Sequence, residues 1–424
     1  MALDGKGIVV LDNGGYNIKT GYVSAEERSR GCDVEGVSSS AEVFPNAVAK
    51  PPKKSSSVAT KRNGGFLVSS ELYDLPSYSG LFFRRPIERG YVKEWDLQRD
   101  VWKYIFSRSK VDPKENCLVV TEPIALPGSL RRGMDELVFE EFGFASYYSA
   151  PPAALVARHF DVTDGLVLDS GFSFSHAVPI LNSGAQQQYS RRLDLGGKVL
   201  TNQLKEVVSF RSWNMMDEFL VINAAKEELC YVAQDFLPEL EETRLPLNEG
   251  NKTMIDYVLP THVSDKENRF GYSRPSVPKR AKGDPGQQEQ PTLTLNNERI
   301  SIPEALFHPS DLGLHQGGLH EIIVESIAAL PKQLQGRVYN NIVLSGGNCK
   351  LPGFEKRLTA ELRALAPDEY DLALTMDKDP ELSAVKGGIK LALSQDLESR
   401  VVTREEYQEE GPRVTAERFY GRAR

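Results

Sequence analysis

Short apolar runs that end in turns of small residues recur along the chain. They are residues 8–11 before the turn 12–15 (DNGG), residues 166–168 before 169–171 (DSG), and residues 342–344 before 345–347 (SGG). A short apolar run bounded by turn residues predicts a buried strand. The first two runs place an aspartate at the strand end. This weak repeat of strand and turn predicts a duplicated architecture of two similar lobes.

Apolar residues with helical spacing separate these runs. One set is Ile222, Ala225, Leu229 and Val232, and another, after a Pro-Gly break, is Phe354, Leu358, Leu362 and Leu365. Recurrence every three or four residues predicts amphipathic helices. The alternation of strands with helices predicts the α/β class.

Two segments lack such a pattern and are predicted to be exposed insertions. Residues 47–64 carry five basic residues and no acidic residue, and residues 264–291 are rich in Pro, Gly and Gln. Neither can bury enough apolar surface to fold alone, so we expect loops. A plain solvated loop is the simpler interpretation, and contact with DNA or acidic partners is the alternative. The basic residues concerned are Lys50, Lys53, Lys54, Lys61, Arg62, Arg274, Lys279, Arg280 and Lys282.

Composition narrows the class of protein. A chain of 424 residues exceeds what one hydrophobic core usually supports, so two or more lobes are expected. The net charge of −8 argues against a surface that binds nucleic acid throughout. Four widely spaced cysteines predict reduced thiols and neither a zinc site nor disulfides. The polar start of the chain predicts no signal peptide, and the lack of a long apolar run predicts no membrane span.

The paired turns suggest a phosphate site. Glycines let backbone N–H groups approach a phosphate closely, and Asp12 and Asp169 are placed to hold the waters of a magnesium ion. Lys19 is placed to reach a phosphate as a point charge. Each turn alone is weak evidence, since such sequences also serve simply to close strands.

Ordered motifs along nearly the whole chain resemble the actin family. Residues 11–22 (LDNGGYNIKTGY) and 168–180 (LDSGFSFSHAVPI) resemble the two phosphate loops of actin. Further actin-like segments follow in the same order at 86–96, 191–200, 226–235, 302–313 and 342–354. Within the family the chain is most similar to the actin-related proteins, and among them to the actin-related protein six subclass.

This resemblance implies a fold and a nucleotide site. The fold is actin-like, with two α/β lobes of ribonuclease-H-like type and a cleft between them that takes ATP or ADP with magnesium. The first lobe would hold residues 1–157 and 398–424, with a loop inserted at about 34–78. The second would hold residues 158–397, with an insertion at about 260–291. The nucleotide-binding residues implied are Asp12, Gly14, Gly15, Lys19, Asp169, Gly171, Gly197, Lys226, Glu227, Gly346 and Gly347, with Asp12 and Asp169 facing the metal through water.

Departures from the family pattern argue against catalysis. Hydrolysis in this family needs a water oriented by a glutamine and a histidine. The histidine is retained as His176, but Pro152 replaces the glutamine and has neither a side-chain amide nor a backbone N–H. We therefore expect no catalytic residue and His176 as a vestige. Further departures in the pocket are Gly15, Tyr16, Phe172, Ser173, Leu351 and Glu381.

The resemblance implies a nuclear scaffold subunit of a Swr/SRCAP-type chromatin remodeller that exchanges a variant histone. Its expected partners are the remodeller ATPase, a small zinc-finger subunit and, through the complex, the nucleosome. The charged insertions predict that the chain does not form a homopolymer. The alternatives are a slow ATPase that acts as a conformational switch or associates with filaments, and, less well supported, a sugar kinase of the same two-lobe fold.

Overall fold

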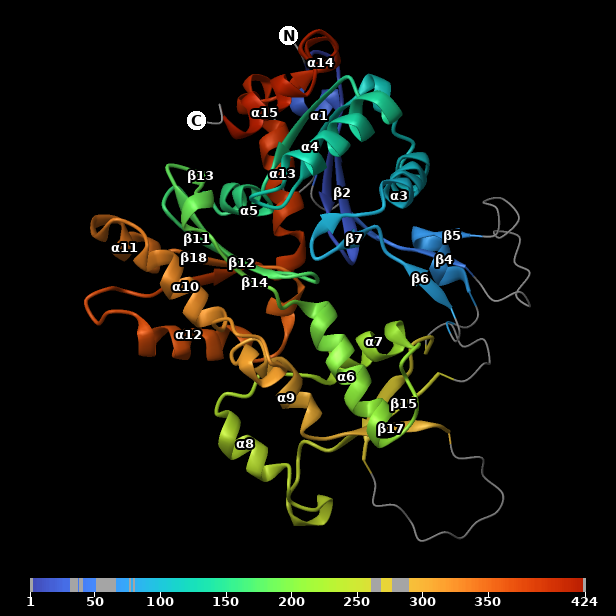
Figure 1. Cartoon of the computed structure of the whole chain (residues 1–424), viewed down its shortest axis with the longest axis vertical. Helices are drawn as coiled ribbons and strands as arrows, with labels where there is room; N and C mark the ends of the chain where they lie inside the picture. The colour runs from blue at the N-terminus through green and yellow to red at the C-terminus, as the bar shows by residue number, and fades with distance from the viewer. Residues whose placement is uncertain are drawn as a thin grey trace.

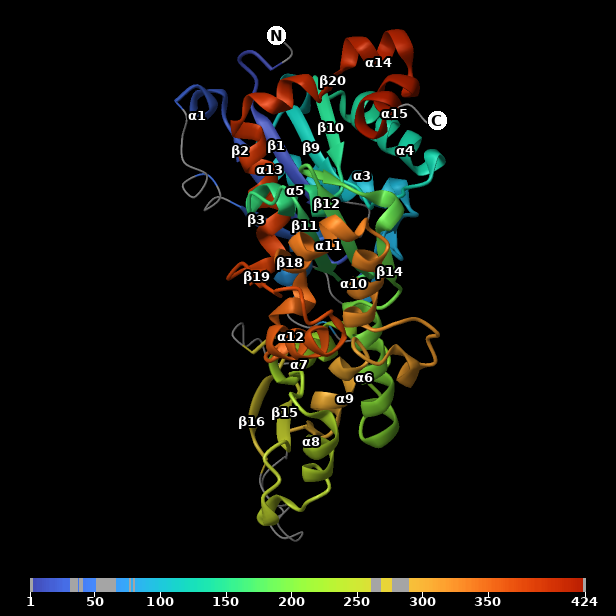
Figure 2. The same ribbon diagram turned by 90° about the vertical axis from the view of Figure 1, so that its left-hand side faces the viewer.

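The computed structural model describes residues 3–30, 37, 41–50, 66–75, 78, 81–260, 268–276 and 290–421. The molecule is elongated, and two six-stranded sheets follow one another along its long axis, as Figure 2 shows. We refer to each sheet with the helices and small sheet packed on it as a lobe. The predicted division of the chain at residues 157 and 397 stays a prediction.

The first sheet has the strand order β20-β10-β9-β1-β2-β3. Its strand β1 pairs in parallel with β9 and antiparallel with β2. The central strands β1 and β9 are buried and mostly apolar, so both faces of the sheet can be covered by helices. Its strands are β1 (Ile8–Asn13), β2 (Asn17–Val23), β3 (Glu42–Pro45), β9 (Cys117–Thr121), β10 (Ser146–Ala150) and β20 (Val402–Thr403).

The second sheet has the order β13-β12-β11-β18-β19, with β14 paired to β12. It repeats the motif of the first sheet, because β11 pairs antiparallel with β12 and in parallel with β18. Asp169 lies beside Ser345 in this register, so the second and third predicted turns leave the sheet at one edge. Its strands are β11 (Gly165–Ser170), β12 (Ser175–Leu181), β13 (Gly184–Ala185), β14 (Arg191–Leu193), β18 (Ile342–Ser345) and β19 (Leu374–Met376).

Two helices lie between the sheets. Helix α5 (Pro152–His159) packs closely against α13 (Ser383–Leu393), with α5 on β11 and α13 on β1 and β2. The close approach needs a glycine, because a Cβ at Gly387 would lie 1.8 Å from the carbonyl oxygen of Leu155. This helix pair therefore lies between the two sheets and joins the lobes (Figure 2).

The remaining helices are divided between the two lobes (Figure 1), and α6 and α7 of the second lobe also line the space between the lobes. Those of the first lobe are α1 (Ala25–Arg30), α3 (Trp95–Arg108), α4 (Gly128–Asp135), α14 (Arg404–Glu410) and α15 (Pro412–Tyr420). Those of the second lobe are α6 (Gly197–Arg211), α7 (Phe219–Leu229), α8 (Phe236–Glu242), α9 (Glu298–Glu304), α10 (Leu319–Ala328), α11 (Lys332–Tyr339) and α12 (Phe354–Leu365).

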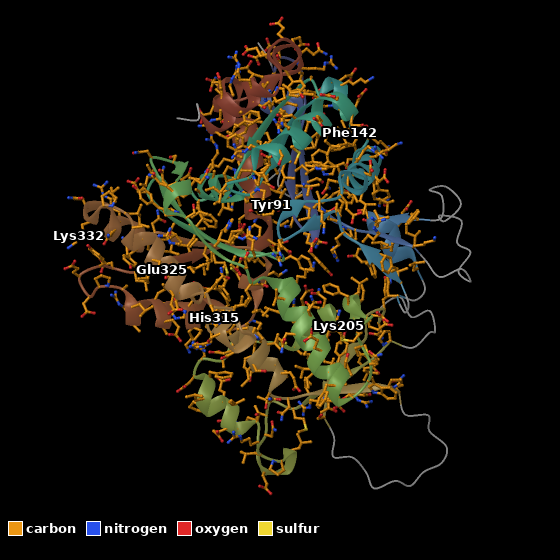
Figure 3. The ribbon with its side chains drawn as sticks, in the orientation of Figure 1. Tyr91, Phe142, Lys205, His315, Glu325 and Lys332 are labelled. Carbon is orange, nitrogen blue, oxygen red and sulfur yellow. The ribbon has the colours of Figure 1, made fainter. Side chains whose placement is uncertain are left out.

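Three small sheets extend the lobes. The sheet β5-β4-β6 belongs to the first lobe, and the sheet β16-β15-β17 packs into the core of the second. The hairpin β7–β8 carries Tyr91, which lies where the lobes meet (Figure 3). The strands are β4 (Val48–Lys50), β5 (Leu67–Val68), β6 (Phe82–Arg84), β7 (Ile87–Glu88), β8 (Tyr91–Val92), β15 (Ile255–Val258), β16 (Tyr272–Pro275) and β17 (Thr292–Leu295).

The structure confirms the α/β class and the actin-like fold and corrects several details. Residues 48–50 are not part of an exposed loop, because Val48 and Ala49 are buried between β5 and β6. Likewise β16 forms within the second predicted insertion. The remaining parts, 51–65, 261–267 and 277–289, lie outside the described residues. The helix predicted to reach Val232 ends at Leu229, whereas α12 spans its whole predicted set.

Candidate functional site

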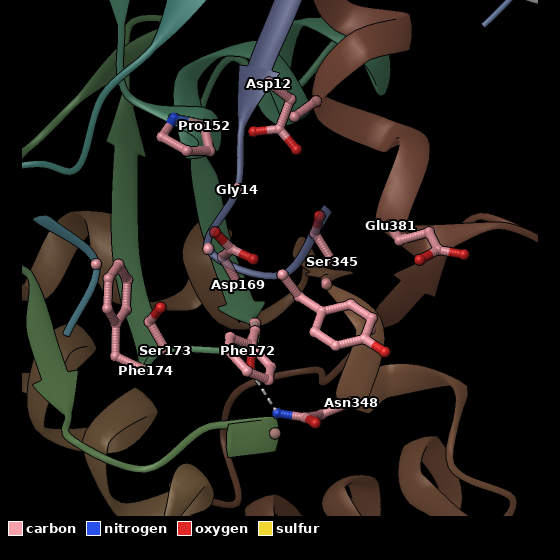
Figure 4. A pocket seen from close by; sticks show the side chains of 18 of the residues that line it. Asp12, Gly14, Pro152, Asp169, Phe172, Ser173, Phe174, Ser345, Asn348 and Glu381 are labelled. Carbon is pink, nitrogen blue, oxygen red and sulfur yellow. Dashed lines mark hydrogen bonds between the residues drawn. The ribbon is translucent and has the colours of Figure 1, made fainter. Parts of the chain in front are cut away.

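A cavity of about 510 Å³ lies between the two sheets. It is bounded by the ends of β1, β11 and β18 and by the first residues of α5 and α6. Every candidate residue predicted from the sequence lines it: Asp12, Gly14, Gly15, Lys19, Pro152, Asp169, Gly171, His176, Gly197, Lys226, Glu227, Gly346 and Gly347. Figure 4 shows Asp12, Asp169 and Pro152 around this space.

The carboxylate of Asp12 is held by the first sheet. Lys19, its neighbour across the β1–β2 pair, places Nζ 2.9 Å from Asp12 Oδ2. Thr121 at the end of β9 donates its hydroxyl to Asp12 Oδ1 at 2.8 Å. Lys19 thus lies in the cavity wall as predicted, but its ammonium is already paired, and its contact with phosphate stays a prediction.

Asp169 is the next-to-last residue of β11 and reaches the cavity from the second sheet. Burial and the nearby Asp12 carboxylate raise the pKa of Asp169 to about 6, against the opposing effect of Lys19. The turn beside it is formed by Gly346, whose φ of +97° is a left-handed conformation that favours glycine. A Cβ there would lie 2.3 Å from the carbonyl oxygen of Ser170, so the two turns pack too closely for any larger residue.

Asn348 ties the third turn to the second. Its amide donates to the carbonyl oxygen of Gly171 at 2.9 Å, shown by the dashed line in Figure 4, and to the Ser170 hydroxyl at 3.1 Å. These bonds fix the two parallel strand ends of the second sheet relative to each other. Contacts within the protein therefore form the wall on this side of the cavity without a ligand.

Lys226 is a buried cation without a close carboxylate partner within the described part of the chain. Its ammonium donates to Thr201 Oγ1 at 2.9 Å, Asn223 Oδ1 at 3.1 Å and the carbonyl oxygen of Gly197 at 3.2 Å. Burial lowers the pKa of Lys226. The bonds to Thr201 and Gly197 join α7 to α6. Asn223 also donates to Glu227 at 2.8 Å, within α7, and so extends the network to that carboxylate.

Pro152 is the first residue of α5, preceded by Pro151 as the cap. Proline suits this position, because the first helical N–H has no partner in the helix. The consequence for chemistry is that this end of α5 presents two pyrrolidine rings to the cavity, with no side-chain amide and no backbone N–H.

His176 is the second residue of β12 and is buried. Its ring packs on Phe174 with centroids 4.3 Å apart. Burial, followed by the charge of Arg192, lowers the pKa of His176 to about 3. The imidazole is therefore neutral at physiological pH, and its surroundings resemble a packed core more than a proton-transfer site.

Large side chains from the two phosphate-loop-like turns meet each other. The rings of Tyr16 and Phe172 have centroids 4.9 Å apart, and the Arg85 guanidinium lies over both, at 4.4 and 5.3 Å. Gly15 lies directly against Ser173, since a Cβ on it would be 2.5 Å from Ser173 Oγ. The departures noted in the sequence thus bring the two turns into contact.

At the other end of the cavity, Lys350 places Nζ 2.9 Å from Glu381 Oε1. Leu351 beside it is buried and supplies no aromatic ring for a base to stack on. The remaining departures therefore lie in the cavity wall, as predicted from the sequence.

The cavity fits a nucleotide with magnesium in size and in donor type. Its volume lies in the usual range for small-molecule sites. Asp12 and Asp169 offer the hard carboxylate oxygens that magnesium takes, usually through retained waters. Asp12, Asp169 and the glycine turns would hold the metal and phosphates, and such a ligand would supply charge that bridges the two sheets.

Sequence reasoning missed four residues of this site. Thr121 ends a buried apolar run, the same signal that marked Asp12 and Asp169, and was available from the pattern. Asn348 directly follows the third glycine turn. Arg85 and Asn223 carry no local signal, because their roles depend on contacts with Tyr16, which is remote in sequence.

Other kinds of site find no support in the described residues. Among them, no three His, Cys, Asp or Glu side chains are grouped so as to hold a metal ion. Cys117, Cys230 and Cys349 are buried thiols without disulfides, and Cys32 lies outside the described residues. Over the same part of the chain, every helix is too short or too polar to cross a membrane.

Comparison with known proteins finds similarity to the actin family along nearly the whole chain. The family model described as actin matches residues 3–420. "Actin-related protein 6" of Oryza sativa subsp. indica is 38% identical, covering 98% of this chain and 99% of its own length. The proteins of the same name from Arabidopsis thaliana and Drosophila melanogaster are 39% and 34% identical, covering 97% and 95% of this chain, and 99% and 97% of their own lengths.

Proposed function

The chain belongs to the actin family, within the class of actin-related protein 6, and we propose on this basis that it is a catalytically weak or inactive scaffold subunit of a nuclear chromatin-remodelling complex. The complex would be of the Swr/SRCAP type and would exchange a variant histone into nucleosomes. Membership of the actin-related protein 6 class supports the proposed place in a remodelling complex. The residues that line the cavity support the proposal that catalysis is weak or absent.

The observation that carries the catalytic part is Pro152. Phosphoryl transfer depends mostly on positioning, here of the attacking water. Pro152 offers that water no hydrogen-bond donor or acceptor, and His176 is packed against Phe174 as a neutral ring. Loss of one such positioning group typically lowers a rate by about 10²-fold or more.

ATP or ADP with magnesium would then be a structural ligand. Asp12 and Asp169 approach one cavity from two sheets, so a metal-bound nucleotide would add a bridge between the lobes. The same pair of carboxylates favours the second candidate, a slow ATPase that switches conformation. In that case turnover would be measurable and would require Asp169.

The proposed partners are the remodeller ATPase, a small zinc-finger subunit and the nucleosome. The basic residues of the two insertions would add contacts with DNA or acidic partners. Of these residues, Lys50 and Arg274 lie in the described part of the chain, and both are exposed. Phosphate contacts would make this binding weaken with salt.

Tagged purification from nuclear extract at moderate salt, followed by mass spectrometry, tests the proposed assembly. We expect a large remodelling ATPase and its companion subunits in fixed stoichiometry. Recovery of the protein alone, with cytoskeletal proteins, or as long filaments would contradict the proposal.

A further inference from the structure

Side chains from both lobes meet across one side of the cavity. The first lobe contributes Tyr16, from the turn between β1 and β2, and Arg85, which follows β6. The second lobe contributes Phe172, from the turn between β11 and β12, with Phe219 and Asn223 from α7. We call these five residues the clasp.

The clasp is held by ring contacts around one cation. The Arg85 guanidinium lies over the rings of Tyr16, Phe172 and Phe219, at 4.4, 5.3 and 5.9 Å from their centroids. Attraction between a cation and ring faces strengthens as the groups are removed from water. Since Tyr16 belongs to one lobe and the two phenylalanines to the other, Arg85 links rings on both sides.

Hydrogen bonds fix the position of the clasp. Arg85 Nη1 donates to the carbonyl oxygens of Tyr16 at 3.0 Å and of Asn46 at 3.3 Å, within the first lobe. Asn223 Nδ2 donates to the Tyr16 hydroxyl at 3.2 Å, across the lobes. Asn223 is itself bound to Lys226, so the clasp is continuous with the network in the cavity wall.

A second contact lies outside the clasp. Tyr78 of the first lobe stacks on Phe270 of the second, with centroids 5.0 Å apart and planes at 10°. Tyr73 meets the same ring edge-on at 6.4 Å. Leu220 of α7 is buried in the same cluster as Leu72, next to the sheet β5-β4-β6, which lies above α7 in Figure 1. The lobes thus share a small apolar core at this edge.

We propose that the clasp, supported by this outer contact, holds the two lobes closed over the cavity without help from a bound nucleotide. All of the contacts join protein to protein, so closure needs no ligand charge to bridge the lobes. A nucleotide would enter or leave only when the clasp opens. The inference goes beyond the scaffold role and holds whether or not the chain hydrolyses ATP.

Distances between spin labels across the lobes test this closure. One label would be placed by Phe82→Cys on β6 and the other by Tyr272→Cys on β16, both at exposed positions, with Cys32→Ser to remove a native thiol. The protein would be stripped of nucleotide with apyrase and EDTA and compared with protein in magnesium and ADP. We expect one narrow distance distribution, the same in both samples. A broad or longer distribution in the stripped protein would overturn the proposal.

A pair of variants distinguishes loss of the clasp from the general effect of removing a phenylalanine ring. Phe219→Ala removes a ring from the clasp, whereas Phe210→Ala makes the same change at a side chain that is 93% exposed on α6. We expect the distribution to lengthen and broaden only in Phe219→Ala. Equal distributions in the two variants would show that the clasp does not hold the lobes.

A milder substitution covers the case in which Phe219→Ala does not fold. Tyr16→Phe keeps the ring over Arg85 and removes only the bond from Asn223. We expect a partial broadening in stripped protein. A distribution unchanged from that of the parent would contradict a clasp that includes Asn223. These measurements involve neither phosphate release nor partner subunits. The clasp can therefore be confirmed when the proposed function is contradicted, and contradicted when the proposed function is confirmed.

Discussion

At the scale of single residues, three lysines of the cavity already have polar partners within the protein. Lys19 is paired with Asp12, Lys226 with three neutral oxygens, and Lys350 with Glu381. A phosphate ligand would have to compete with these partners for the lysines. Any buried carboxylate that lost its lysine would then need a new partner, because an unpaired buried charge is costly. The cavity can therefore keep the size of a nucleotide site while its affinity is lower than the lining residues alone suggest.

His176 predicts a specific dependence of stability on pH. Its pKa is about 3 in the folded chain and about 6.5 in the unfolded chain, so between these values only the unfolded chain binds the proton. The free energy of unfolding therefore falls as the pH is lowered through this range. Between pH 7 and pH 5, the free energy of unfolding of the parent should fall by about 2 kcal/mol more than that of a His176→Gln variant.

Urea unfolding of both proteins at several pH values measures this difference. Because the variant keeps every other titrating group, subtracting the two curves isolates the histidine. A constant difference across the range would show that His176 titrates normally and is accessible to water.

Residues at strand ends could be predicted from the sequence, and residues that act across the lobes could not. Asp12 and Asp169 follow apolar runs, and the cavity lies where such strands end. The bond between Asn223 and Tyr16 joins positions 207 residues apart. No local pattern encodes such a contact, because it exists only once both lobes have folded.

At the scale of elements, the β7–β8 hairpin depends on a glycine. Gly90 has φ +86°, and a Cβ there would lie 1.9 Å from the ring of Phe174 in the other lobe. Gly90→Ala should therefore lower the free energy of unfolding by at least about 2 kcal/mol, through backbone strain and a clash with the ring. Gly128→Ala, at the start of α4 with nothing within 4 Å, is the matched control and should be near neutral.

Chemical denaturation of the two glycine variants gives the comparison. Equal stabilities would mean that Phe174 moves aside easily and that the hairpin is not fixed against the second lobe. The same hairpin carries Tyr91, whose ring lies 5.4 Å from the Arg192 guanidinium of β14. We therefore expect Gly90→Ala to weaken this contact between the lobes as well.

Elements with strong apolar patterns were predicted well, and short strands within polar segments were not. Helix α12 follows directly from the helical spacing of its apolar residues, and strands β1, β11 and β18 follow from short apolar runs that end in turns. Strand β4 lies in a basic, proline-flanked segment, and its burial depends on pairing with β5 and β6. Pairing partners that lie far along the chain override local composition.

At the scale of the whole molecule, closure by protein contacts suits a scaffold. A lobe arrangement that does not depend on ligand presents the same outer surfaces before and after nucleotide binding. Partner subunits that bind both lobes would then meet a preformed surface and lose less conformational entropy on assembly. Under the proposed function, Pro152 and the clasp would both favour a rigid actin fold that does not hydrolyse ATP.

Phosphate release from magnesium ATP by the purified protein is the decisive measurement of whether the cavity hydrolyses nucleotide. The comparison is with Asp169→Ala, prepared identically, which removes a carboxylate placed to hold the metal while leaving contaminating ATPases unchanged. We expect both proteins to release phosphate at the same background rate. Release by the parent that clearly exceeds background and is abolished in Asp169→Ala would contradict this expectation and establish a working ATPase in the cavity.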